Sequence, residues 1–124
     1  MSATDRLQRA TAELPRARRD ASADDPTGAL QHACQALEAA LKAIIAHESQ
    51  TVPTGQRGHD LRYLQSTAHA DLSPHTSIID ELTGVYDMAR YVDTPDPGIS
   101  DAQRVISEVE AVVTFAQEYL ATEP

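Results

Sequence analysis

Residues 31–64 decide the fold of this chain: QHACQALEAALKAIIAHESQTVPTGQRGHDLRYL. Apolar side chains recur here at intervals of four, three, four and three residues, at Leu30, Cys34, Leu37, Leu41 and Ile44. That spacing is the period of one helix face, and alanines of high helix propensity fill the positions between. The stretch therefore predicts a helix over 26–48, a Pro/Gly loop over 50–58 and a second helix that opens at 59–61.

The N-terminal segment predicts a less regular helix. Its apolar face is thin, and Pro15 lies in the middle of it. A proline inside a helix removes a hydrogen bond and clashes with the preceding turn. We therefore expect either a kink at Pro15 or two short helices, the second over 16–23. Asp25 and Pro26 then provide a cap and a favoured first helical residue for the long helix that follows.

Three more helices are expected after the loop. The first is short and covers about 59–70, and the next begins at Ser73-Pro74, again a cap followed by proline. Ser100 and Gln103 form a capping-box pattern, which starts a last helix over 101–121. Since no strand-like alternation occurs, the sequence predicts one all-α domain, an antiparallel bundle of about five helices.

The composition fits packed helices and excludes a broad nucleic-acid surface. Of 124 residues, 41% are hydrophobic but only 4% are aromatic, so the core must be aliphatic. The net charge is −9, which argues against DNA binding. Residues 1–20 are an exception, with five arginines against three acids, and we interpret them as a basic N-terminal helix within a single domain over 1–124.

Cysteine content and hydropathy point to a cytoplasmic protein. Cys34 is the only cysteine, and its place on the apolar face predicts a buried structural thiol. No apolar run approaches the roughly 20 residues of a membrane span, and the first residues lack the apolar region of a signal peptide. We expect no membrane association.

Three motifs resemble those of one family, HEPN (higher eukaryote and prokaryote nucleotide-binding domains). The long helix and the next helix start supply most of the matching residues, His32, Ala33, Gln35, Ala36, Glu38, Ala40, Leu41, Lys42 and Ala43, then Gly58, His59, Asp60 and Leu61. ARYVD at 89–93 is similar to the family's A-R-Y-P-D, with valine in place of proline. The resemblance covers about residues 21–120 and implies a helical bundle that forms a homodimer.

The resemblance also bears on catalysis. Catalytic HEPN proteins carry an arginine followed four to six residues later by a histidine, whereas Arg90 is followed by YVDTPDPG and no later histidine. This departure implies a subunit without the family's ribonuclease activity. Arg62 and His69, with six residues between them, offer a displaced alternative that would act as a metal-independent endoribonuclease. Both would share a helix face two turns apart, or they are a surface arginine and a helix-end histidine.

A candidate ligand site precedes and opens the third helix: Arg57, His59, Asp60 and Arg62. A helix N-terminus carries free N–H groups and partial positive charge, so Arg57 and His59 beside it would cradle a phosphate or a nucleotide. Alternatively, His59 or Asp60 caps the helix and Arg57 is a loop charge. Some HEPN domains resemble nucleotide binders, which favours the ligand site.

Arg90 and Tyr91 are the remaining candidates for this cleft. In the family their motif fixes the end of the bundle and lines a cleft. The structural alternative is that Arg90 interacts with the last carbonyls of its helix while Tyr91 packs its ring. His32 and Cys34 point to different helix faces, so we expect no metal site and no cofactor, and we expect His32 to hydrogen-bond between helices.

These observations lead to one main hypothesis and two alternatives. The main hypothesis is a non-catalytic HEPN-like subunit that binds a nucleotide or a nucleotidyltransferase partner, in a toxin–antitoxin type module. Its cleft would be lined by five residues: Arg57, His59, Arg62, Arg90 and Tyr91. The alternatives are a ribonuclease toxin that acts on RNA through Arg62 and His69, and a plain helical dimerisation module.

Overall fold

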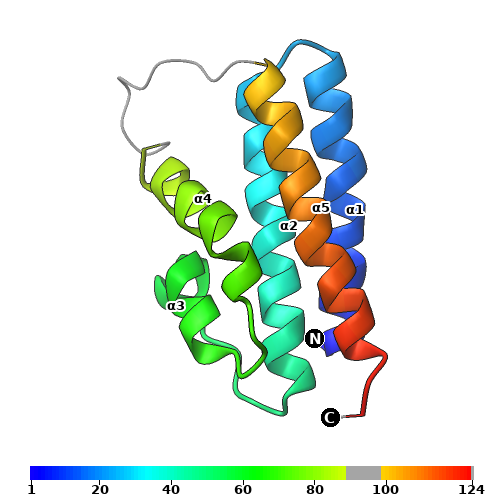
Figure 1. Ribbon diagram of the computed structural model, residues 1–124, viewed down its shortest axis with the longest axis vertical. Coiled ribbons are helices and arrows are strands. Elements are labelled where there is room, and N and C mark those ends of the chain that lie inside the picture. The colour runs from blue at the N-terminus through cyan, green and yellow to red at the C-terminus, as the bar shows by residue number, and fades with distance from the viewer. Residues whose placement is uncertain (89–98, 124) are drawn as a thin grey trace.

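The computed structural model describes residues 1–88 and 99–123, and this part of the chain contains five α-helices and no strand (Figure 1). Three long helices lie side by side along the long axis of the molecule: α1 (Ala3–Ser22), α2 (Pro26–His47) and α5 (Ile99–Leu120). α1 runs in the direction opposite to α2 and α5. The prediction of an all-α helical bundle is confirmed.

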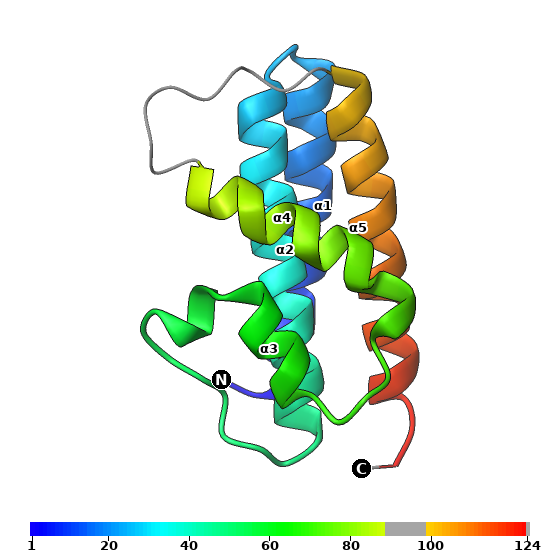
Figure 2. The ribbon, with the colours of Figure 1, turned by 60° about the vertical axis from the view of Figure 1, so that its left-hand side comes forward.

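The two shorter helices lie against one side of this layer. α3 (Leu61–Thr67) follows the 3-10 turn η1 (Arg57–His59), and α4 (Thr76–Met88) follows the 3-10 turn η2 (Ser73–His75). Figure 2 shows α4 lying obliquely across the long helices, with α3 near the end of the molecule where both termini lie. Arg104 of α5 connects the layers, because its Nη2 lies 2.7 Å from Oε2 of Glu81 in α4.

α1 is one continuous helix through Pro15, so the expectation of two short helices is wrong. Ser2 caps it in a reciprocal box with Asp5, whose backbone N–H donates to the Ser2 hydroxyl over 3.0 Å. Pro15 is exposed, so water can reach the Thr11 carbonyl that proline leaves without a helical donor. Buried residues at helical spacing hold the helix on α2 across this point: Ala10, Leu14, Ala17 and Ala21.

α2 is the centre of the core, as the sequence predicts. It begins at Pro26, with the Asp25 carboxylate accepting the Gly28 N–H over 3.0 Å, and ends within one residue of the expected boundary. Its apolar positions are almost wholly enclosed, including Leu37, Leu41, Ile44 and Ile45. Small alanines between them let α1 and α5 approach closely, so a core without aromatic bulk remains well packed.

α3 is shorter than expected, because it begins at Leu61 and ends at Thr67 instead of covering 59–70. Residues 57–59 form η1, and Ala68 already has extended backbone angles. The physical cause is the Glu48 carboxylate at the end of α2, which accepts the backbone N–H groups of His69 and Ala70, each over 2.8 Å. These two N–H groups therefore donate to Glu48 and not to carbonyl groups of α3, so the helix does not continue past Thr67.

α5 also departs from its expected start. It begins at Ile99, so Ser100 already lies inside the helix. Within the described ranges, no helix has both the length and the apolar character needed to cross a bilayer.

Candidate functional site

The loop after α2 presents a group of polar side chains that we call the η1–α3 surface, formed by Arg57, His59, Arg62 and Tyr63. Glycine shapes the loop at two points. Gly55 has a φ of +65°, and a Cβ on buried Gly58 would stand 2.8 Å from the Pro53 carbonyl oxygen. Only glycine permits that approach without a backbone shift, so η1 is held tightly against the preceding loop.

Asp60 is the cap of α3. Its Oδ1 accepts the Tyr63 backbone N–H over 3.2 Å, while its own backbone is extended. The carboxylate therefore stands where an anion at the helix N-terminus would bind, and α3 has only seven residues. The geometry does not favour a phosphate on the free N–H groups of this helix, so any anion must be held by side chains.

Arg57 lies over the face of Tyr63. Its guanidinium carbon is 5.1 Å from the ring centroid, within the range of a cation–π interaction, and Nη1 lies 3.5 Å from the Tyr63 hydroxyl oxygen. Within the described ranges, no carboxylate pairs with Arg57. The tyrosine ring thus holds the guanidinium in place without neutralising it.

His59 and Arg62 connect the surface to other helices. His59 Nδ1 lies 2.7 Å from Oε1 of Glu38 in α2, and the other Glu38 oxygen lies 3.6 Å from Lys42 Nζ. Arg62 Nε donates to Oδ1 of Asp80 in α4 over 2.9 Å. The side chains of His59 and Arg62 are 54% and 61% exposed, so both remain open to a ligand that competes with these carboxylates.

The structure places Arg57 and His59 in η1 and Arg62 in the first turn of α3, and their side chains turn to three different partners, Tyr63, Glu38 of α2 and Asp80 of α4. Lys42, Arg57 and Arg62 are the only lysine and arginine residues between positions 21 and 88, and all three lie at or beside this surface. Three carboxylates, Glu38, Asp60 and Asp80, lie at the same surface, so the formal charges there balance in a chain whose net charge is −9. Arg90 and Tyr91, the other expected residues of the cleft, lie outside the described residues.

The alternative pair, Arg62 and His69, does not share a helix face. α3 ends at Thr67, so His69 lies beyond it. The His69 backbone N–H donates to Glu48 at the end of α2, whereas the Arg62 side chain donates to Asp80 of α4, so the two residues bond to different helices. The two-turn spacing that suggested a shared catalytic face is therefore not realised.

Sequence reasoning missed the polar cluster around Glu48. Besides the N–H groups of His69 and Ala70, its carboxylate accepts the Gln50 side-chain amide over 2.8 Å and the Tyr119 hydroxyl over 2.7 Å. Burial raises the pKa of Glu48, but these four hydrogen bonds together hold that pKa below its usual value. The carboxylate in turn raises the pKa of Tyr119. Because Glu48 and Tyr119 are 71 positions apart in the sequence, no local pattern could have shown the pair.

A second polar cluster joins α1 to α2. His32 Nδ1 lies 2.6 Å from Oε2 of Glu13, and its Nε2 lies 3.3 Å from Oδ2 of Asp20. Glu13 is only 4% exposed and also receives a hydrogen bond from Arg16. The prediction that His32 bonds between helices is confirmed, although the sequence did not identify Glu13 as the partner.

Neither cluster has the arrangement of a metal site. Within the described ranges, no three His, Cys, Asp or Glu side chains are arranged to hold an ion. Cys34 is buried as predicted, and this burial raises the pKa of its thiol to about 12, so it stays protonated and unreactive at neutral pH.

Comparison with known proteins identifies the family. A family model described as HEPN domain matches residues 3–119, nearly the whole chain and including α1. Neither the curated proteins nor the solved structures gave a match.

Proposed function

The chain belongs to the HEPN domain family, and from this premise we propose that it is a non-catalytic subunit that binds a nucleotide or a nucleotidyltransferase partner. Binding would take place through the η1–α3 surface, in a cytoplasmic homodimer that serves a toxin–antitoxin type module. Arg90 and Tyr91 are proposed as further residues of the same site.

The arrangement of Arg57 is the observation that carries this proposal. An exposed guanidinium that lies over a tyrosine ring, and that pairs with no carboxylate among the described residues, keeps most of its donors for an incoming anion. Arg62 adds a guanidinium that is already ordered by Asp80, and His59 adds an imidazole that is already ordered by Glu38. Because these side chains need little further ordering, they can bind a phosphate or an acidic partner surface at a lower entropic cost.

The test compares three glutamine variants of one purified chain. Arg57→Gln and Arg62→Gln alter the surface, and Arg9→Gln removes a similarly exposed arginine from α1 as the matched control. Each protein is titrated with a panel of nucleoside mono-, di- and triphosphates and with a small nucleotidyltransferase from the same genome. We expect at least tenfold weaker binding in the two surface variants, about 1.4 kcal/mol, and no change in the control.

The thermal melts of the same samples separate the alternatives. A ligand at 100 times its dissociation constant stabilises the folded state by about 2.7 kcal/mol, so binding must raise the melting temperature. If no nucleotide and no nucleotidyltransferase binds, the proposal is wrong and a plain helical module remains. If the chain cleaves RNA and Arg62→Ala and His69→Ala each abolish cleavage, the ribonuclease alternative is correct instead.

A further inference from the structure

α1 presents a line of arginines to solvent. Arg9, Ala12, Arg16 and Arg19 follow one another at intervals of three, four and three residues, and all four are exposed. That spacing is the seam along which one helix packs on another, and it extends about 15 Å over these positions. We call this line the α1 seam. Figure 1 shows α1 and α3 on opposite sides of α2, so the seam is separate from the η1–α3 surface.

Most of the guanidinium donors in the seam are open to solvent. Among the described residues, no carboxylate pairs with Arg9 or Arg19. Arg16 donates from Nη1 to Oε1 of buried Glu13 over 2.7 Å, but its side chain is still 51% exposed. Because a guanidinium carries five N–H donors, this one contact leaves others available. The seam therefore holds three cations that can accept carboxylates from outside.

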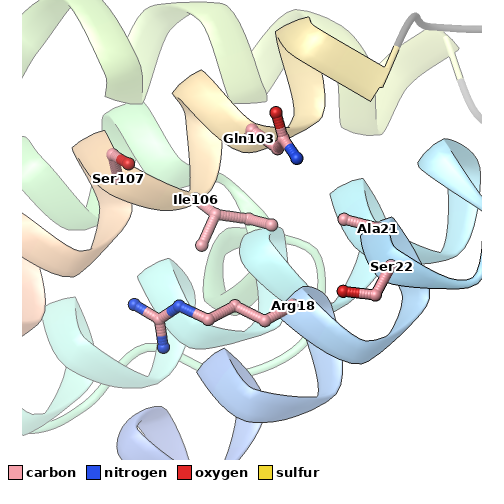
Figure 3. A pocket seen from close by; sticks show the side chains of 6 residues that line it. All are labelled: Arg18, Ala21, Ser22, Gln103, Ile106 and Ser107. Carbon is pink, nitrogen blue, oxygen red and sulfur yellow. The ribbon is translucent and has the colours of Figure 1, made fainter.

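Arg18, by contrast, is used within the molecule. It pairs with Glu110 of α5. Figure 3 shows the Arg18 side chain at the junction of α1 and α5, with Ile106 of α5 beside it. This arginine links two helices of the core layer. Arg9 and Arg19 make no such link among the described residues, so packing within the fold does not explain their alignment.

The centre of the seam is small and apolar. Ala12 lies between Arg9 and Arg16, and exposed Pro15 follows Ala12 by three residues. The distance between packed helices depends on the side chains at the contact, so small ones let a second helix approach closely. The arginine stems can then lie along that helix with their charged ends at its flanks.

Charge decides what kind of helix fits. A second copy of α1 does not, because an antiparallel pair centred on Ala12 places Arg9 against Arg16, and a parallel pair aligns identical arginines. A long polyanion is also disfavoured. The net charge is −9 overall and +2 in residues 1–20, so residues 21–124 carry −11 and repel negative charge that extends beyond α1. A short acidic helix contacts α1 alone and avoids both penalties.

We propose that the α1 seam binds a helix of a partner protein that presents carboxylates at intervals of three and four residues along one face. These carboxylates pair with Arg9, Arg16 and Arg19, since a guanidinium can hold a carboxylate through two parallel hydrogen bonds. A small side chain of the partner packs on Ala12. This partner differs from the ligand of the η1–α3 surface, so the inference goes beyond the proposed function and does not depend on it.

Fluorescence anisotropy of two labelled, end-capped peptides tests the seam on the full chain. Both are alanine-rich helices of identical composition, but one carries its glutamates on one face at the seam spacing and the other spreads them around the helix. The first should bind about tenfold more tightly, and added salt should weaken it. The double variant Arg9→Gln, Arg19→Gln should lose about tenfold in affinity, because two ion pairs are lost together. Ala12→Glu should also weaken binding, whereas Ala12→Gln should do so less.

The matched control is the double variant Arg57→Gln, Arg62→Gln, which changes the net charge equally. It should bind the peptide as the unaltered chain does, because these two arginines turn to different partners and form no line along one helix. If this control loses the peptide while the seam variant keeps it, the inference fails and the η1–α3 surface of the proposed function is the acidic-partner site. Thermal melts of every variant exclude misfolding as the cause of lost binding.

Other outcomes would also overturn the inference. Equal affinity for the two peptides would show only unspecific attraction between charges, and no binding of either would remove the site. An RNA oligonucleotide that binds more tightly than the peptide, and is lost in the seam variant, would assign the arginines to nucleic acid. Self-association in light scattering that the seam variant abolishes would assign them to a second copy of the chain.

Discussion

Glu48 shows how one side chain can fix the ends of three segments. Its carboxylate accepts donors from Gln50, from the chain after α3 and from Tyr119 of α5, and these bonds lower its pKa. A folded-state pKa below the unfolded value, about 4.3 for glutamate, means that the stabilisation is present above that pH and is lost as the pH falls through the folded pKa. We predict that the free energy of unfolding decreases below about pH 4.3 and that Glu48→Gln flattens this dependence.

The same substitution should also destabilise the protein at neutral pH. Replacing the charged acceptor by an amide weakens up to four hydrogen bonds on a partly exposed group, a loss of about 1–2 kcal/mol after allowance for solvent. Urea unfolding at pH 7 and pH 4 measures both effects, and exposed Glu123→Gln is the control. A Glu48→Gln variant whose stability falls with acid as steeply as the unaltered chain would show that other carboxylates carry the pH dependence.

Tyr119 allows the contribution of its hydroxyl to be measured alone. Tyr119→Phe keeps the ring, which stacks on Phe115 at 5.8 Å between centroids, and removes only the donor to Glu48. We expect a loss of about 1 kcal/mol. In the double variant with Glu48→Gln the loss should be smaller than the sum of the two single losses, because the pair interacts directly. Additive losses in urea unfolding would contradict the contact.

At the scale of elements, Pro15 destabilises α1, and the packing of α1 against the core outweighs this loss. Proline within a helix costs about 3 kcal/mol relative to alanine, and Pro15 is exposed, so nothing in the core depends on its ring. We predict that Pro15→Ala stabilises the protein by about 1–3 kcal/mol and raises the melting temperature by several degrees. Ala12→Gly, at another exposed position of the same helix, should lower it. A lower melting temperature for Pro15→Ala would mean that the ring makes a needed contact.

The boundaries of a helix can be predicted from the sequence when the residues that set them lie close by in the chain. The start of α2 follows from Asp25 and Pro26, and its core face follows from apolar spacing, so both could be predicted. The early end of α3 could not, because Glu48 imposes it from another helix. The continuity of α1 depends on burial against α2, which outweighs the local effect of Pro15. In the candidate site, the sequence predicts Arg57, His59 and Arg62 as neighbours, but it does not predict the carboxylates that contact His59 and Arg62 or the tyrosine that contacts Arg57.

At the scale of the whole molecule, the separation of Arg62 from His69 leads to a prediction about activity. The Arg62 side chain donates to Asp80 and the His69 backbone N–H donates to Glu48. The two residues would have to break these hydrogen bonds to act as one acid–base pair. We expect the purified chain to elute as a homodimer by light scattering, at twice its 13.4 kDa mass, and to leave RNA intact. Arg62→Ala and His69→Ala should be indistinguishable from the unaltered dimer in a cleavage assay. RNA cleavage by that dimer, lost in both variants, would mean that the two side chains come together in the assembly and that the subunit is catalytic.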